Sequence, residues 1–326
     1  MIDAGHLRPV YAGCTEHYYA NTRSKLAENM NAYWHNPAET IYTLLRALPH
    51  VPTQVREPLR RYIQAEWRYA PSTTCTHMGW GGAKREWADI PPELEPWFKG
   101  NYQAKPGNHN RGFKGWGFNP YNFYACWKYA EEFGSAKEIL SAVRRLARPL
   151  PAESFIADKP HVLNCYIAGY YGLLGLEELA GEQRDETIEQ WLKAALARRV
   201  AMCDQDPRTL TSIEAGGFLF LVPELGEYLH KHARDKVAAQ VRLQNEIITP
   251  LWFLARVDES TKLPVHTKFN EGATSHFYDV SGTFNAMALA LKLPRARLVP
   301  YLDCPLVQRG DLFYIQNLVS AIEAGR

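Results

Sequence analysis

The chain has 326 residues, of which 46% are hydrophobic and 22% are charged, and its formal net charge is +2. This composition is too apolar for a disordered chain, and the length suffices to bury a sizeable core in one or two domains. The small net charge excludes a global field that would draw the chain to nucleic acid or anionic lipid.

Proline punctuation predicts helices from residue 37 onward. Pro37, a first-turn proline after Asn36, opens a helix over 37–48, and Pro52 and Pro71 enclose a second over 52–69. The next helices begin at Pro120 and Pro160. Further helices are predicted at 185–204, 215–233, 234–247, 276–292 and 308–324.

Residues 70–118 interrupt this helical pattern. They hold much of the chain's glycine and tryptophan and show little helical period. An irregular segment of this length in a compact domain is usually functional or disordered. The tryptophans argue against disorder, so we predict that 70–118 forms one wall of a cleft.

The predicted helices are of two kinds. Residues 161–176 (HVLNCYIAGYYGLLGL) and 284–291 are apolar all round, whereas 185–203 carries one apolar stripe opposite charged residues. The apolar segment 161–176 is shorter than the roughly 20 residues of a membrane span, so we predict a buried helix and no membrane partner. Buried and amphipathic helices alternate, as in hairpins arranged in two concentric rings.

The alternation, the helix starts YNFY (121–124) and HVLN (161–164), and the closing DLFYIQNLVSAIEA (311–324) resemble the six-hairpin glycosidase-like (α/α) toroids. This architecture is shared by several glycoside hydrolase and polysaccharide lyase families, and the resemblance covers most of 15–325. It implies one all-α toroid domain over 1–326, alone or within a longer parent protein. The resemblance is architectural, and no catalytic motif of one family transfers, so the fold alone does not establish the function.

In such toroids the N-terminal ends of the inner helices and the loops before them open onto a central cleft. The polar and aromatic residues at these places are therefore the candidate carbohydrate-binding residues. They are Trp34, His35, His77, Trp80, Trp116, Tyr121, Asn122, Tyr124, His161 and Asn164.

A glycosidase requires two carboxyl groups across the scissile bond. The candidates are Glu86, Glu214, Glu271 and Asp279, each in a loop or at a helix start among apolar or aromatic neighbours. Burial there would bring the pKa of a carboxyl group towards the range of a general acid. Each is also explained as an N-cap or surface carboxylate, since acids are favoured in the first turn of a helix.

A polysaccharide lyase instead uses a tyrosine or histidine base beside groups that neutralise a uronate. The pairs His276 with Tyr278 and His161 with Asn164, followed by Tyr166, offer these residue types. The segment from Pro96 to Ala130 contains no Asp or Glu and is locally basic, which slightly favours the binding of an anionic sugar. A buried histidine at a helix start also commonly just satisfies a backbone carbonyl.

Sequence motifs of other enzyme classes are absent. There is no P-loop, HExxH, GxSxG or GxGxxG sequence. We expect His230 and His232 at a surface position rather than in a metal site, and we expect no metal and no cofactor. The six cysteines are scattered without a CxxC pair, which favours buried thiols: Cys14, Cys75, Cys126, Cys165, Cys203 and Cys304.

The leading hypothesis is a carbohydrate-active enzyme that hydrolyses a poly- or oligosaccharide. A polysaccharide lyase comes second, a non-catalytic domain that binds glycans or partners third, and a terpene-cyclase-like barrel last because no Asp-rich motif is present. No signal peptide is predicted from MIDAGHLRPVYAG, so the chain as it stands is expected in the cytoplasm.

Overall fold

The computed structural model describes residues 37–69, 71–73, 120–146, 160–204, 219–245, 282–302 and 312–324. This part of the chain is 85% helical and contains no strand, which confirms the all-α prediction for the described residues. The chain divides into two compact units, Met1–Ala12 with Met30–Lys193 and Gly13–Asn29 with Ala194–Arg326. The single toroid domain over 1–326 stays a prediction.

The first unit consists of helical hairpins at the predicted places. Pro37 and Pro160 each occupy the first turn of a helix, as the sequence predicts. Gly134 ends one helix with φ +84°, and its N–H donates to the carbonyl of Ala130 at 2.8 Å. The helices are α3 (Pro37–Ala47), η4 (Leu48–His50), α4 (Thr53–Tyr69), α7 (Tyr121–Phe133), α8 (Ala136–Leu146) and α9 (Pro160–Leu179). Helix α10 (Glu186–Met202) belongs to this unit as far as Lys193.

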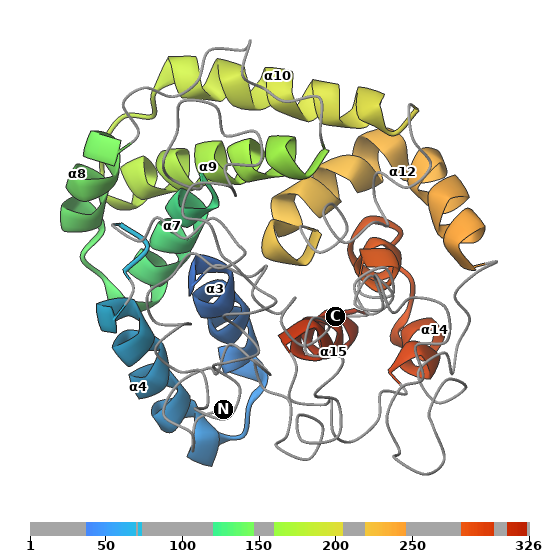
Figure 1. Ribbon diagram of the computed structural model, residues 1–326, viewed down its shortest axis with the longest axis horizontal. Coiled ribbons are helices and arrows are strands. Elements are labelled where there is room, and N and C mark those ends of the chain that lie inside the picture. Colours follow the sequence, from blue (N-terminus) through green and yellow to red (C-terminus); the bar gives the residue numbers. More distant parts are fainter. Residues whose placement is uncertain are drawn as a thin grey trace, which may run out of the picture. The chain divides into compact units, whose positions relative to one another are not determined.

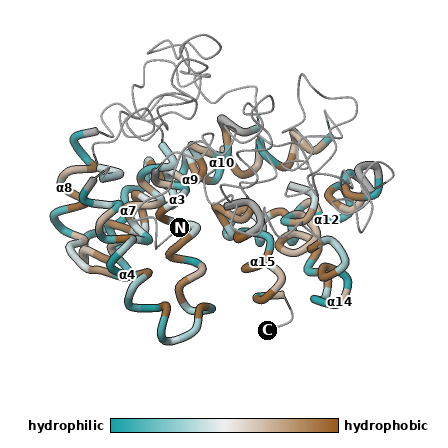
Figure 2. The backbone as a smooth tube through the Cα atoms, turned by 60° about the horizontal axis from the view of Figure 1, so that its bottom comes forward, coloured by the Kyte–Doolittle hydropathy of each residue, from teal (hydrophilic) through white to brown (hydrophobic). Residues whose placement is uncertain are grey.

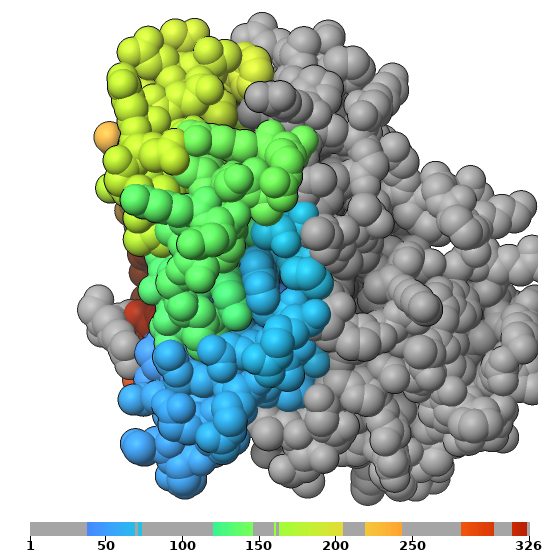
Figure 3. All heavy atoms as spheres, turned by 90° about the vertical axis from the view of Figure 1, so that its left-hand side faces the viewer, coloured from blue at the N-terminus to red at the C-terminus, as the bar shows by residue number. Residues whose placement is uncertain are grey.

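Two layers of helices make up the first unit. Helices α3, α7 and α9 are nearly continuous in buried residues, whereas α4, α8 and α10 each expose a charged side. Figure 1 shows α4, α8 and α10 on the outer side of α3, α7 and α9. Hydrophilic residues recur along α4 and α8 in Figure 2. On the face drawn in Figure 3, the blue segment, which contains α4, lies next to the green segment, which contains α8. The predicted alternation of buried and amphipathic helices is therefore present in this unit.

Three glycines on one side of α9 bring α7 into close contact. A Cβ on Gly169 would lie 2.9 Å from Cβ of Pro120, one on Gly172 would lie 2.3 Å from the backbone of Phe123, and one on Gly175 would lie 2.3 Å from the ring of Trp127. Both sequence numbers rise together along the contact, so α7 and α9 run in the same direction. Hydrogen side chains at these positions let the two backbones approach more closely than a larger side chain would permit.

An aromatic stack fastens α4 to α7. The ring of Trp67 lies parallel to that of Tyr129 with centroids 3.9 Å apart, and Tyr129 meets Phe133 at 4.7 Å. The guanidinium of Arg60 lies 5.0 Å from the centre of the Phe133 ring and also pairs with Glu132. Stacked rings and a cation over an aromatic face both add to the energy of area burial.

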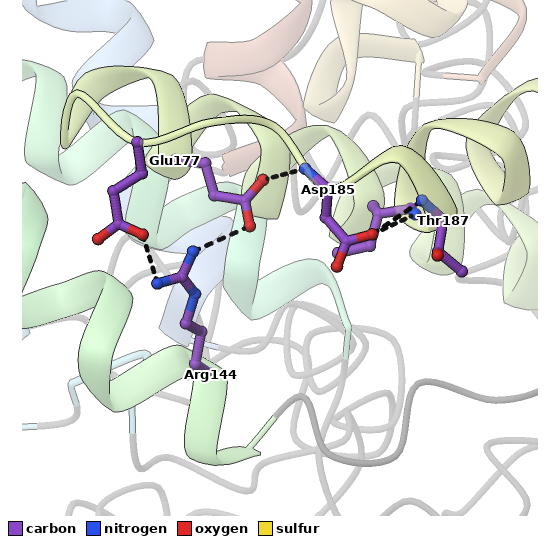
Figure 4. Close-up of polar contacts among 6 residues, drawn as sticks. Arg144, Glu177, Asp185 and Thr187 are labelled. Carbon is purple, nitrogen blue, oxygen red and sulfur yellow. Dashed lines mark hydrogen bonds and ion pairs between the residues drawn. The ribbon is translucent and has the colours of Figure 1, made fainter.

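A carboxylate near the end of α9 joins three helices. Glu177 accepts a hydrogen bond from Arg144 of α8 at 3.2 Å and another from the backbone N–H of Asp185 at 2.9 Å (Figure 4). Arg144 also pairs with Glu182 at 2.5 Å. We call Arg144, Glu177, Glu182 and Asp185 the Glu177 network. It holds α8 and the α9–α10 connection against the end of α9.

Asp185 is the N-cap of α10. Its Oδ1 accepts hydrogen bonds from the backbone N–H groups of Thr187 at 2.8 Å and Ile188 at 3.2 Å. We expect Asp185→Ala to lower the free energy of unfolding by about 1 kcal/mol because two helical N–H groups lose their acceptor. Asp185→Asn keeps an acceptor at the same place and should change it by only a few tenths. Urea unfolding followed by circular dichroism measures both, and equal losses for the two variants would contradict the capping role.

The second unit contains the remaining described helices. In α12 (Pro223–Asn245) the backbone leaves helical geometry at Ala233, with φ −144°, so the predicted boundary between helices at 233 and 234 is confirmed. The segment 282–290 ends as the π-helix η7 (Ala286–Ala290), in which the N–H of Leu291 donates to the carbonyl of Ala286 at 2.9 Å. The others are α14 (Arg295–Leu298), η8 (Val299–Tyr301) and α15 (Leu312–Glu323).

Buried amides and capping side chains connect these helices. The Nδ2 group of Asn285 donates to Oδ1 of Asn317 at 3.3 Å, and Ser320 donates to Oδ1 of Asn285 at 2.8 Å. Arg295 donates to the carbonyls of Ala321 and Ile322 at the end of α15. A cation at a helix C-terminus also interacts favourably with the helix dipole.

His230 has a structural partner in the second unit. It is half-buried, and its Nδ1 lies 2.7 Å from the carbonyl oxygen of Ala290, at the end of η7. His232 is exposed and its ring lies 4.3 Å from that of Tyr228. The predicted surface position therefore describes His232, while His230 links α12 to η7. The two side chains differ because residues two apart face different sides of a helix.

The other predictions meet the structure in part. Cys126, Cys165 and Cys203 are buried free thiols, as predicted, and the pKa of each is raised by burial. Within the described ranges, no helix is long and apolar enough to cross a bilayer. The cleft wall at 70–118 and the remaining cysteines fall outside the described residues, apart from 71–73.

Candidate functional site

Most of the predicted site residues lie outside the part of the chain that the structure describes. This applies to all candidate catalytic residues, Glu86, Glu214, Glu271, His276, Tyr278 and Asp279, and to Trp34, His35, His77, Trp80 and Trp116. The residues that the structure does place are Tyr121, Asn122, Tyr124, His161 and Asn164. Of His161 only the backbone is described, in the first turn of α9.

Three tyrosines meet at the start of α7. The ring of Tyr42 on α3 lies 5.2 Å from that of Tyr124 and 6.5 Å from that of Tyr121, both edge to face. Tyr121 and Tyr124 stack on one another at 5.7 Å. Tyr121 and Tyr124 are fully buried. The structure thus joins two predicted residues with a third, Tyr42, that the sequence did not indicate.

Asn122 lies on a different side of α7. It precedes Tyr129 by seven residues, which is two helical turns, so both face the same way. Because Tyr129 stacks on Trp67, this side of α7 faces the outer helix α4. The role of Asn122 in binding stays a prediction, but its placement suits a contact between the two helix layers better than one with Tyr121 and Tyr124.

Helix α9 extends beyond the start of α7. Gly169 lies opposite Pro120, and Asn164 precedes Gly169 by five residues, so it stands about 7.5 Å beyond that level at 1.5 Å per residue. Asn164 is fully buried. Its amide therefore lies past the first turn of α7, on the N-terminal side of the three tyrosines.

Tyr166 faces away from Asn164. Its ring contacts Tyr170, which in turn contacts Trp191 of α10, so this side of α9 faces the outer layer. Burial raises the pKa of Tyr166 well above its ordinary value, and the neighbouring Cys165 adds to the effect. A phenol that is harder to ionise is a poorer proton acceptor at neutral pH. Burial thus opposes ionisation of Tyr166, and its role as the base of a lyase stays a prediction.

Tyr171 is a further aromatic residue at the level of the α7 start. It lies between Gly169 and Gly172, which contact Pro120 and Phe123. Within residues 163–177 it alone is half-buried, while the others are buried. The sequence carried no signal for this difference, because 161–176 is uniformly apolar and shows no solvent-facing stripe.

Glu39 is a buried carboxylate that the sequence did not indicate. It lies in the first turn of α3, three residues before Tyr42, and its side chain is only 6% exposed. Its negative charge raises the pKa of Cys165, after the larger effect of burial. Cys165 follows Asn164 directly, so the charge of Glu39 acts on α9 next to Asn164.

These residues lie in the N-terminal parts of three buried helices, and the rings of the three tyrosines contact one another. We call Glu39, Tyr42, Tyr121, Tyr124 and Asn164 the inner-helix cluster. Its members carry a carboxylate, an amide, phenol hydroxyls and aromatic rings, and all five residues are buried. No group of three or more His, Cys, Asp or Glu that could hold a metal ion occurs among the described residues.

Comparisons with known proteins add no relative. No protein-family model, no curated protein and no solved structure matches the chain.

Proposed function

We propose that the chain is a carbohydrate-active enzyme with an (α/α) toroid architecture that hydrolyses glycosidic bonds of a poly- or oligosaccharide. The observation that supports this most is the inner-helix cluster, which gathers sugar-compatible groups at the N-terminal ends of α3, α7 and α9. A toroid enzyme binds its substrate at this end of its inner helices.

The arrangement of helices gives a second line of support. In the first unit, buried helices lie inside amphipathic ones, and α7 and α9 run in the same direction. Hairpins wound into a ring produce this pattern, because every inner helix is followed by an outer helix that returns the chain. The proposal extends the pattern of one unit to the whole chain.

The chemistry that we propose uses two carboxyl groups. One donates a proton to the glycosidic oxygen as its bond to the anomeric carbon breaks, and the other accepts a proton from the attacking water in an inverting reaction. In a retaining reaction the second group attacks the anomeric carbon first. The candidates remain Glu86, Glu214, Glu271 and Asp279.

The test is a panel of neutral and uronate-containing polysaccharides incubated with the full chain. We expect new reducing ends without the absorbance of an unsaturated uronate. Products that absorb in that band would replace the hydrolase with a lyase. Binding of a glycan without any cleavage would replace it with the non-catalytic domain, and neither binding nor cleavage would overturn the carbohydrate proposal as a whole.

A further inference from the structure

We draw no further inference here: the strongest candidate, the apolar side of α15 in the second unit with the 39%-exposed Leu318 and the half-buried Ile315 and Ile322, carries none because nothing in the described part of the chain shows what covers it.

Discussion

Gly172→Ala is expected to lower the free energy of unfolding by about 3 kcal/mol, the upper end of the usual cost of overpacking a core. The added Cβ would lie 2.3 Å from the backbone carbonyl carbon of Phe123 and 2.3 Å from the backbone nitrogen of Tyr124. Backbone atoms cannot swing aside as the end of a side chain can, so α7 and α9 must separate. Alanine's better helix propensity, about 1 kcal/mol, does not offset this cost.

Gly226→Ala is the matched control for this substitution. Gly226 also lies in a helix, α12, but a Cβ there would be 3.3 Å from the Cβ of Leu289, a contact that a small shift relieves. We expect its free energy of unfolding to change by less than about 1 kcal/mol, because propensity and crowding oppose one another. Urea unfolding measures both variants. A Gly172→Ala variant as stable as Gly226→Ala would show that α7 and α9 are not in such close contact.

The separation of α7 and α9 also bears on the inner-helix cluster. Tyr124 contributes both its backbone to the glycine contact and its ring to the contact with Tyr42. A shift of α7 away from α9 therefore moves Tyr121 and Tyr124 relative to Asn164. Under the proposed function, any folded fraction of Gly172→Ala should lose saccharide binding as well as stability.

Glu177→Ala should lower the free energy of unfolding by about 2 kcal/mol, within the range for leaving buried donors without an acceptor. The variant removes the acceptor of the Asp185 N–H and one partner of Arg144. The loss should be smaller than for a fully buried pair because the Arg144 side chain is 45% exposed and can turn to water or to Glu182.

Glu178→Ala is the control for the Glu177 network. Glu178 is the next residue of α9 and pairs with Arg184 at 3.1 Å, but its side chain is 70% exposed against 6% for Glu177. An exposed ion pair contributes about 0–1 kcal/mol, so this variant should be nearly neutral. Chemical unfolding of the two variants in parallel decides the point, and equal effects would remove the special role of Glu177 in joining α8, α9 and α10.

Helix positions followed from the sequence because their signals are local. Pro37 and Pro160 restrict their own backbone, and a first-turn proline lacks only an N–H that the helix does not use. The predicted boundary at 233 coincides with the kink at Ala233. The uniformly apolar segment 161–176 likewise predicted a buried helix, since such a segment must be covered by protein on every side.

The sequence also contained the spacing of Gly169, Gly172 and Gly175, three residues apart, which places them near one side of a helix. It could not identify the partner of this side. Only the packed structure shows that Pro120, Phe123 and Trp127 face the glycines and that the two helices therefore run in the same direction.

The candidate site depended more strongly on tertiary structure. By sequence, Glu39 is an ordinary first-turn acid, and Asn122 stands beside Tyr121 as an equal candidate. The structure shows that the Glu39 carboxylate is buried. It also shows, through the stacking of Tyr129 on Trp67, that the side of α7 with Asn122 faces α4. A local sequence determines which residues share a helix face, but which helix covers that face is decided by contacts between segments far apart in the chain.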